Sequence, residues 1–248
     1  MFTTELYTSS VASGALNQVT SKYSGVTPTL NSGFQVPSLN YLAAVTLVGA
    51  TARRCQIQAP SLRTKPYPDF APVNVGAGLF ESPPRFADLF KNPLPLAYTE
   101  EVDMFAVVGT TNIQYGAIWL SDGPVQPSGF NGGFTVHCTS STTLTAGAFT
   151  TVALTLDQAL PAGLYSLVGA RVYSATAVIF KMIPAMGPLW QPGGIGVQAY
   201  DGLTPDGQRY GGWGEWLRFQ QNVPPSVSLF ATAADTAQEA WLDLIKIG

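Results

Sequence analysis

A short sequence recurs about halfway along the chain. Leu47-Val48-Gly49-Ala50 returns as Leu167-Val168-Gly169-Ala170, 120 positions later in a chain of 248 residues. Three further pairs keep the same order: Asn92 to Pro95 with Asn222 to Pro225, Phe105-Ala106 with Phe230-Ala231, and Trp119 with Trp241. The spacing drifts between pairs, which requires insertions in loops, where insertions are best tolerated. Because the period is too long for a solenoid repeat, the pattern predicts a duplicated domain, with two copies in one chain.

The composition predicts a surface that is partly covered by other protein. Only 11% of the residues are charged, against about 25% in typical soluble domains. The longest nearly apolar run, Leu42 to Ala50, is far shorter than the roughly 20 residues that a membrane-spanning helix needs. Interface cores are depleted in charge, so burial between subunits is the better explanation. The net charge of −3 provides no general attraction to nucleic acid.

The chain divides into four predicted segments. Residues 1–33 are rich in Ser, Thr, Gly and Asn and are predicted to form an extended N-terminal arm, with a frayed terminus as the alternative. Residues 34–123 and 134–248 are the two predicted domains, and residues 124–133 are the linker between them. The proline-rich stretch from Ala59 to Pro95 is typical of long loops rather than helices.

Strand patterns dominate both predicted domains. Runs rich in Val, Thr and aromatic residues predict strands at 41–57, 101–120, 134–138, 149–156, 163–170, 175–183 and 227–230. The segment from Glu239 to Ile247 fits either a helical stripe or a strand, and its correspondence with the Trp119 segment favours the strand. Many short strands with long Pro/Gly loops indicate an all-β protein, specifically two tandem jelly-roll β-sandwiches.

The sequence offers little that could support catalysis. His137 is the only histidine, and the adjacent Cys138 would point to the opposite face of a strand, which disfavours a Cys/His pair. A cupin-type metal site typically uses several histidines. Glu100, Glu101 and Asp103 could supply paired carboxylates, but nothing fixes a second acid at the separation that glycoside hydrolysis requires. We therefore expect no enzyme, no catalytic residues, no cofactor and no metal.

The two cysteines, Cys55 and Cys138, fall one in each predicted domain. They do not form a disulfide framework or a CxxC metal motif, so both are predicted to be buried as small hydrophobic residues. The beginning of the sequence shows no secretory signal pattern. Synthesis and assembly in a cytoplasm is the corresponding expectation.

The segment from Tyr210 to Phe219 is the most distinctive candidate site. Its aromatic residues and arginine could stack on a sugar or nucleobase, pack in an ordinary core, or anchor an interface between subunits or domains, for which Trp, Tyr and Arg are favoured. We predict the interface, with these candidate residues: Tyr210, Trp213, Trp216, Arg218 and Phe219. A basic cluster could face a genome or lipid headgroups and consists of Arg53, Arg54, Arg63 and Lys65.

On the paired strands, the paired Asn/Pro corners and the two tryptophan-containing strand ends, the chain resembles the double jelly-roll major capsid proteins of tailless icosahedral viruses, including bacteriophages. The resemblance implies a structural coat protein in the virion, a homotrimer forming pseudo-hexagonal capsomers that contact neighbouring capsomers and other virion proteins, without cofactor or catalysis. Members of that lineage are commonly longer. The alternative is a phage receptor-binding, carbohydrate-binding or capsid decoration protein with a β-sandwich fold.

Overall fold

The computed structural model describes residues 1–23, 33–63, 66–74, 87–185, 190–198, 204 and 206–248. Within these ranges the chain consists of β-strands and loops, apart from two single-turn 3-10 helices, η1 (Pro60–Leu62) and η2 (Asp206–Gln208). It divides into two compact units. The N-terminal unit comprises Thr3–Pro124, and the C-terminal unit comprises Val125–Gly248 together with Met1–Phe2. The protein is therefore all-β, as the sequence predicts.

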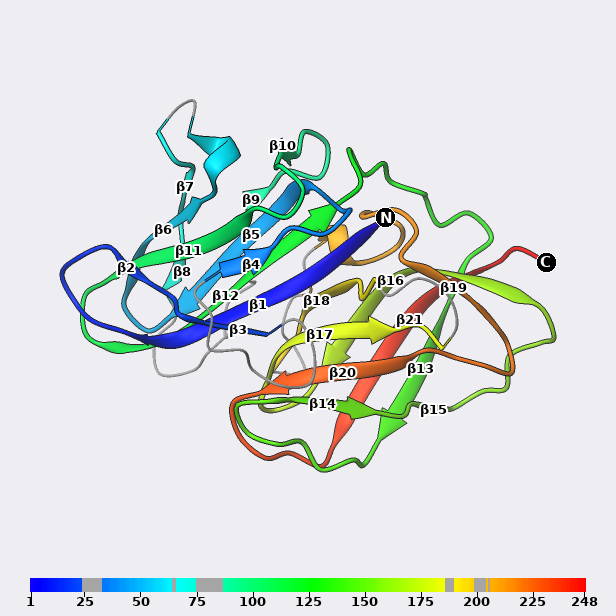
Figure 1. Ribbon diagram of the computed structural model, residues 1–248. Coiled ribbons are helices and arrows are strands. Elements are labelled where there is room, and N and C mark those ends of the chain that lie inside the picture. Colours follow the sequence, from blue (N-terminus) through cyan, green and yellow to red (C-terminus); the bar gives the residue numbers. More distant parts are fainter. Residues whose placement is uncertain (24–32, 64–65, 75–86, 186–189, 199–203, 205) are drawn as a thin grey trace. The chain divides into compact units, whose positions relative to one another are not determined.

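The N-terminal unit contains two sheets (Figure 1). The larger sheet runs β3 (Ser21–Tyr23), β1 (Phe2–Val11), β12 (Asn112–Ser121), β5 (Tyr41–Gly49) and β10 (Leu94–Pro95), with β8 (Val73–Asn74) and β9 (Ala87–Asp88) also on β5. The smaller sheet runs β2 (Asn17–Gln18), β11 (Glu101–Val108), β6 (Ala52–Gln58) and β7 (Asp69–Phe70), with β4 (Gly33–Gln35) also on β11. The Tyr7 hydroxyl donates a hydrogen bond to the Val102 carbonyl across the two sheets at 2.6 Å.

The C-terminal unit also contains two sheets. One runs β15 (Thr155–Leu156), β13 (Phe134–Ser140), β21 (Gln238–Lys246), β16 (Leu164–Tyr173) and β19 (Leu217–Gln220). The other runs β14 (Phe149–Val152), β20 (Ser226–Ala231), β17 (Ala177–Ile183) and β18 (Gly193–Ile195). Figure 1 shows β13, β21 and β16 side by side. The final segment is thus strand β21, as the comparison with the Trp119 segment predicts.

The two units share one strand order. The main strands are, in chain order, β1, β2, β5, β6, β7, β10, β11 and β12 in the N-terminal unit, and β13, β14, β16, β17, β18, β19, β20 and β21 in the C-terminal unit. In each unit the first strand neighbours the eighth, followed by the third and sixth, while the other sheet joins the second, seventh, fourth and fifth. This is the eight-stranded, double-sheet arrangement of a jelly roll.

The repeated sequence marks equivalent strands without marking equivalent residues. Both tetrapeptides lie in or directly after the third strand of their unit, and both tryptophans lie in the eighth. However, Leu47 pairs with Gly116 and Leu167 pairs with Leu244, so aligning the tetrapeptides does not align Trp119 with Trp241. The tetrapeptide match and the tryptophan match therefore require different alignments of the two units. What the units share is the order of their strands.

The prediction of an N-terminal arm is wrong for the beginning of the chain. Residues 2–11 form β1, which lies between β12 and β3 in the larger sheet, and its Leu6 and Tyr7 side chains are buried. Residues 17–18 and 21–23 also form strands. The error arose because β1 buries Thr3, Thr4 and Glu5 along with its apolar residues, so it shows no alternation of polar and apolar positions. The remainder of the expected arm, residues 24–32, lies outside the described residues.

Candidate functional site

Two of the five residues predicted for the interface belong to the core of the C-terminal unit. Trp213 and Trp216 are only 1% and 3% exposed. Their rings stack at 6.1 Å, and Trp216 also stacks on Phe180 of β17 at 6.0 Å. Phe2 meets both indoles edge-on, at 6.2 and 5.5 Å. These two tryptophans therefore stabilise the fold, and a partner could not reach them without opening the unit.

The other three predicted residues differ in exposure. Phe219 of β19 is buried and stacks on Tyr165 at 5.8 Å. Arg218, the preceding residue, is exposed and forms an ion pair with Glu215 at 2.9 Å. Tyr210 is also exposed, at 53%. Of the five residues, Tyr210 and Arg218 are therefore at the surface, and the other three lie in the interior.

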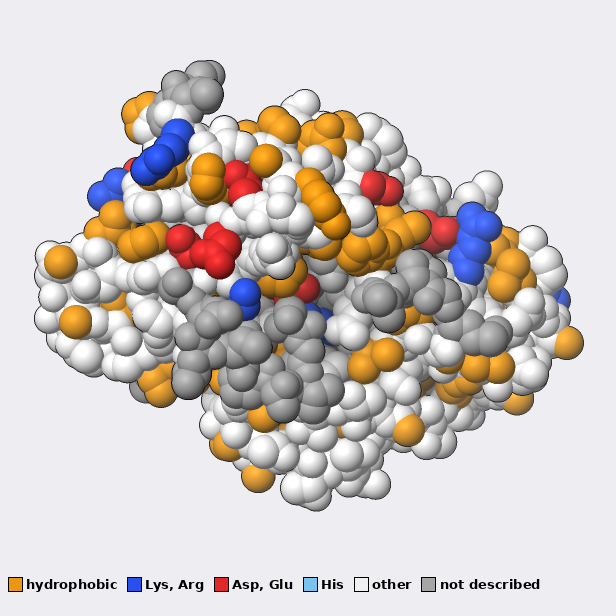
Figure 2. Space-filling view, in the orientation of Figure 1, with side chains coloured by type: hydrophobic (Ala, Val, Ile, Leu, Met, Phe, Trp, Pro, Cys, Tyr) orange, Lys and Arg blue, Asp and Glu red, His pale blue; other side chains and the backbone are white. Residues whose placement is uncertain are grey.

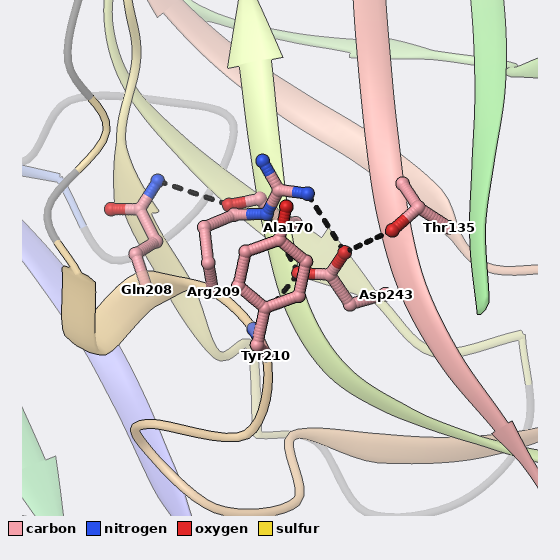
Figure 3. Close-up of polar contacts among 6 residues, drawn as sticks. All are labelled: Thr135, Ala170, Gln208, Arg209, Tyr210 and Asp243. Atoms are coloured by element: carbon pink, nitrogen blue, oxygen red, sulfur yellow. Dashed lines mark hydrogen bonds and ion pairs between the residues drawn. The ribbon is translucent and has the colours of Figure 1, made fainter. Parts of the chain in front are cut away.

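A buried carboxylate fixes the loop that carries Tyr210 (Figure 3). Asp243 of β21 is fully buried. It accepts hydrogen bonds from the Arg209 guanidinium at 2.7 and 2.8 Å, from the Thr135 hydroxyl at 2.8 Å and from the Tyr210 amide at 3.0 Å. A buried charge needs both an opposite charge and hydrogen-bond donors to be tolerated, and Asp243 has both. The sequence pattern did not reveal this carboxylate as a site residue, because a lone Asp in a strand gives no signal of its own.

Two neighbouring residues let the loop approach the sheet. A Cβ at Gly169 of β16 would lie 2.7 Å from an Asp243 carboxylate oxygen and 2.9 Å from the backbone of Arg209 and Tyr210. Gln208 is fully buried and links β16 to β18, because its side-chain amide donates to the Ala170 and Ile195 carbonyls at 3.3 and 3.0 Å. The loop is consequently held by side-chain hydrogen bonds in addition to backbone ones.

Tyr210 has a left-handed backbone conformation that residues other than glycine rarely adopt. Its φ is 52°, a conformation that costs of order 1 to 3 kcal/mol and persists only where the surroundings impose it. Here the Asp243 carboxylate and the Gly211 amide, which donates to the Val168 carbonyl at 2.7 Å, impose it. The ring lies over the Arg209 guanidinium at 4.5 Å and 5.1 Å from the Phe130 ring. An exposed aromatic surface is thereby held in a fixed position.

The single histidine lies in a second polar cluster of the same sheet. Nδ1 of His137 is 2.5 Å from Oδ2 of Asp157, and Nε2 is 3.1 Å from Oε2 of Glu239. Its ring packs against Trp241 at 5.0 Å, and the Arg171 guanidinium lies over that indole at 5.1 Å. The hydrogen bond with Asp157 raises the pKa of His137, burial opposes the rise, and Glu239 adds to it. Cys138 is buried on the opposite face of β13, as alternation along a strand requires.

Of the three acidic residues considered for catalysis, Glu101 and Asp103 are close to each other, and Glu100 has its own set of hydrogen-bond donors. Glu100 accepts hydrogen bonds from the Ala97 amide at 2.7 Å and from the amide and hydroxyl of Ser61, which is an anchoring role. Asp103 is half-buried and accepts from the Gln18 side chain at 3.0 Å. Burial raises the pKa of Asp103, and the nearby Glu101 carboxylate acts in the same direction. Nothing in this arrangement assigns the carboxylates a reaction.

The basic cluster is only partly available for binding. Arg54 forms a bidentate pair with Asp69 at 2.7 and 2.8 Å, which neutralises its charge locally. Arg63 donates to the Tyr67 hydroxyl at 2.9 Å, and Arg53 is exposed. Lys65 lies outside the described residues.

Both cysteines are free and buried, as expected, and burial raises the pKa of each thiol to about 12. Across the described ranges, no three side chains of His, Cys, Asp or Glu gather as metal ligands would. The described part of the chain has no helix long and apolar enough to span a membrane. Figure 2 shows charged side chains scattered singly or in small groups among uncharged ones on the visible face.

Comparison with known proteins gives one structural likeness. No family model matches the sequence, and no curated protein matches it. Among solved structures, the chain is similar to the crystal structure of the major capsid protein P2 from bacteriophage PM2, with 10% sequence identity, coverage of 100% of this chain and 98% of that chain, and a TM-score of 0.27. A TM-score this low does not establish a shared fold, so the jelly-roll assignment rests on the strand order described above.

Proposed function

We propose that this protein is the major coat subunit of an icosahedral virus shell, with a structural role that involves neither catalysis nor a cofactor. The observation that carries the proposal is the repetition of one jelly-roll strand order in both units of a single chain. Jelly rolls are recurrent building blocks of viral capsids. A homotrimer of such chains would present six similar units, which would give a pseudo-hexagonal capsomer for packing into a closed shell.

The composition supports extensive contact with other copies. A content of 11% charged residues is low for a protein whose whole surface faces water, and it suits contacts with neighbouring capsomers and other virion proteins. We infer that Tyr210 and Arg218 are the accessible members of a subunit contact, while Trp213, Trp216 and Phe219 support them from within the unit. Location in the virion after assembly in the host cytoplasm belongs to the same proposal.

Arg53, Arg63 and Lys65 are the proposed contacts to an internal membrane or to the genome. Arg54 contributes less to this role, because Asp69 already pairs with it. The attraction of such a small basic group would be strongly weakened by salt.

Size-exclusion chromatography with light scattering, followed by electron microscopy of the same fractions, tests the proposal. We expect a trimer with threefold symmetry or closed particles. The variant Tyr210→Ser should shift the population towards monomers, whereas Tyr98→Ser, which alters a tyrosine that is 67% exposed outside the proposed contact, should not. A protein that stays monomeric at high concentration in both the parent and the variants would overturn the shell assignment.

A second candidate function is a receptor-binding, carbohydrate-binding or decoration protein. The observation that favours it is the exposed Tyr210 ring held beside Phe130 and Arg209, since a fixed aromatic surface can stack on a sugar. Glycan-array binding that Tyr210→Ser abolishes, together with a small oligomer in place of capsomers, would favour this function over the shell.

A further inference from the structure

A polar cluster that the proposed function does not use surrounds the single histidine. His137 of β13 lies between two carboxylates from different parts of the C-terminal unit, 2.5 Å from Asp157 and 3.1 Å from Glu239. When both ring nitrogens carry a proton, each can donate to one carboxylate, and such charge-assisted hydrogen bonds are stronger than neutral ones. Neutral imidazole keeps one N–H and no charge, so deprotonation removes one of the two hydrogen bonds and the charge assistance of the other.

One of these carboxylates belongs to a weakly attached edge of the sheet. Asp157 directly follows β15, which pairs with β13 through only two residue pairs, Cys138 with Leu156 and Thr139 with Thr155. The Asp157 amide adds one hydrogen bond to the His137 carbonyl at 3.1 Å. The side-chain contact between Asp157 and His137 is a further tie between this edge and β13.

The charges around the imidazole favour its cationic form. Asp157 faces it from the segment after β15, and Glu239 faces it from β21. Arg171 of β16 is the opposing positive charge, but Trp241 lies between it and His137, since both pack on that indole. On β16, Tyr173 is the cross-strand neighbour of Glu239. Asp243 lies two residues after Trp241 on β21, and Arg209 neutralises its charge.

We propose that protonated His137 is a pH-sensitive clasp that strengthens the attachment of the β15 edge to β13, and that this attachment weakens as the imidazole loses its proton. The direction follows from linkage. Because the pKa of His137 is raised in the folded protein, the stabilisation is fully present below the ordinary histidine pKa and disappears as pH rises through the raised value. Release would expose backbone donors and acceptors of β13, an edge on which another strand could pair.

Nuclear magnetic resonance tests the clasp directly in the full chain, because the one histidine gives one set of imidazole signals. We expect His137 to titrate above its ordinary range. Across that titration, the hydrogen-exchange protection factor of the Asp157 amide, corrected for the intrinsic pH dependence of exchange, should fall several-fold. The variant Asp157→Asn should return the pKa towards its ordinary value and lower the protection in acid, and Glu239→Gln should have a smaller effect.

The control Asp122→Asn removes the same charge from an exposed position in the N-terminal unit and should leave both readouts unchanged. His137→Gln should give low protection at every pH. If that variant does not fold, the titration and exchange of Asp157→Asn decide the matter alone. An ordinary pKa for His137, or protection of Asp157 that does not follow its titration, would overturn the clasp. The inference concerns the C-terminal unit alone and does not depend on the proposed shell function.

Discussion

At the scale of single residues, neighbouring positions of one segment have opposite environments, because Trp213 and Trp216 are buried and Tyr210 is exposed. Aromatic residues are favoured in interfaces and cores alike, so residue type could not separate Trp213 and Trp216 from Tyr210. Their separation depends on backbone conformation, because the turn at Tyr210 directs its ring outwards while the two indoles stack inside. Asp243 shows the opposite case, a central buried residue with no sequence signal.

Replacement of Trp213 by alanine should therefore destabilise the fold and not selectively weaken assembly. The side chain is 1% exposed and contacts both Phe2 and Trp216, so its removal leaves a cavity. We expect a loss of about 3–5 kcal/mol in the free energy of unfolding, measured by urea denaturation of the C-terminal unit. Tyr98→Ser, at an exposed position, should change it by less than about 0.5 kcal/mol. Unchanged unfolding of Trp213→Ala would contradict the core assignment.

At the scale of elements, most long strands could be predicted and the first one could not. The strands around Leu47 and Leu167 carry continuous apolar runs, which are visible in sequence because both faces are covered. In β1 the buried positions include Thr3, Thr4 and Glu5, and this polar content hides the strand. Short strands such as β18, which contains Gly193 and Gly194, are equally invisible because they depend on tertiary pairing.

Gly169→Ala tests how closely the loop containing Tyr210 must approach β16. The new methyl group would lie 2.9 Å from backbone atoms of Arg209 and Tyr210, and 2.7 Å from the Asp243 carboxylate. Because backbone atoms cannot move aside without strain, we expect the free energy of unfolding to fall by about 1–3 kcal/mol. Hydrogen exchange at the Tyr210 amide should also become faster. Gly248→Ala is the matched control, since its nearest neighbouring atom would be 3.8 Å away. Equal stability of the two variants would show that the loop is not held against the strand as described.

At the scale of the whole molecule, the repeated tetrapeptide correctly indicated a duplicated architecture, although its residues do not align with the tryptophan match in register. Strand order is retained because it is fixed by which segments can pair and cover one another, whereas side chains can change while the core stays filled. For the same reason the sequence could suggest two jelly rolls but could not specify the pairing of individual residues. The division of the chain was also not fully readable, since its first two residues group with the C-terminal unit.

Phe2→Ala tests that grouping. Phe2 is 1% exposed and contacts Trp213 and Trp216, more than 200 positions later in the sequence, so its loss should create a cavity in the C-terminal unit. We expect the free energy of unfolding to fall by about 3–5 kcal/mol. Hydrogen exchange with mass spectrometry should show this as faster exchange of the backbone amides in β16 and β17. Met1→Ala, at a 51% exposed position, should leave this protection intact. Lost protection confined to the N-terminal unit would instead show that Phe2 stabilises only the strand that it begins.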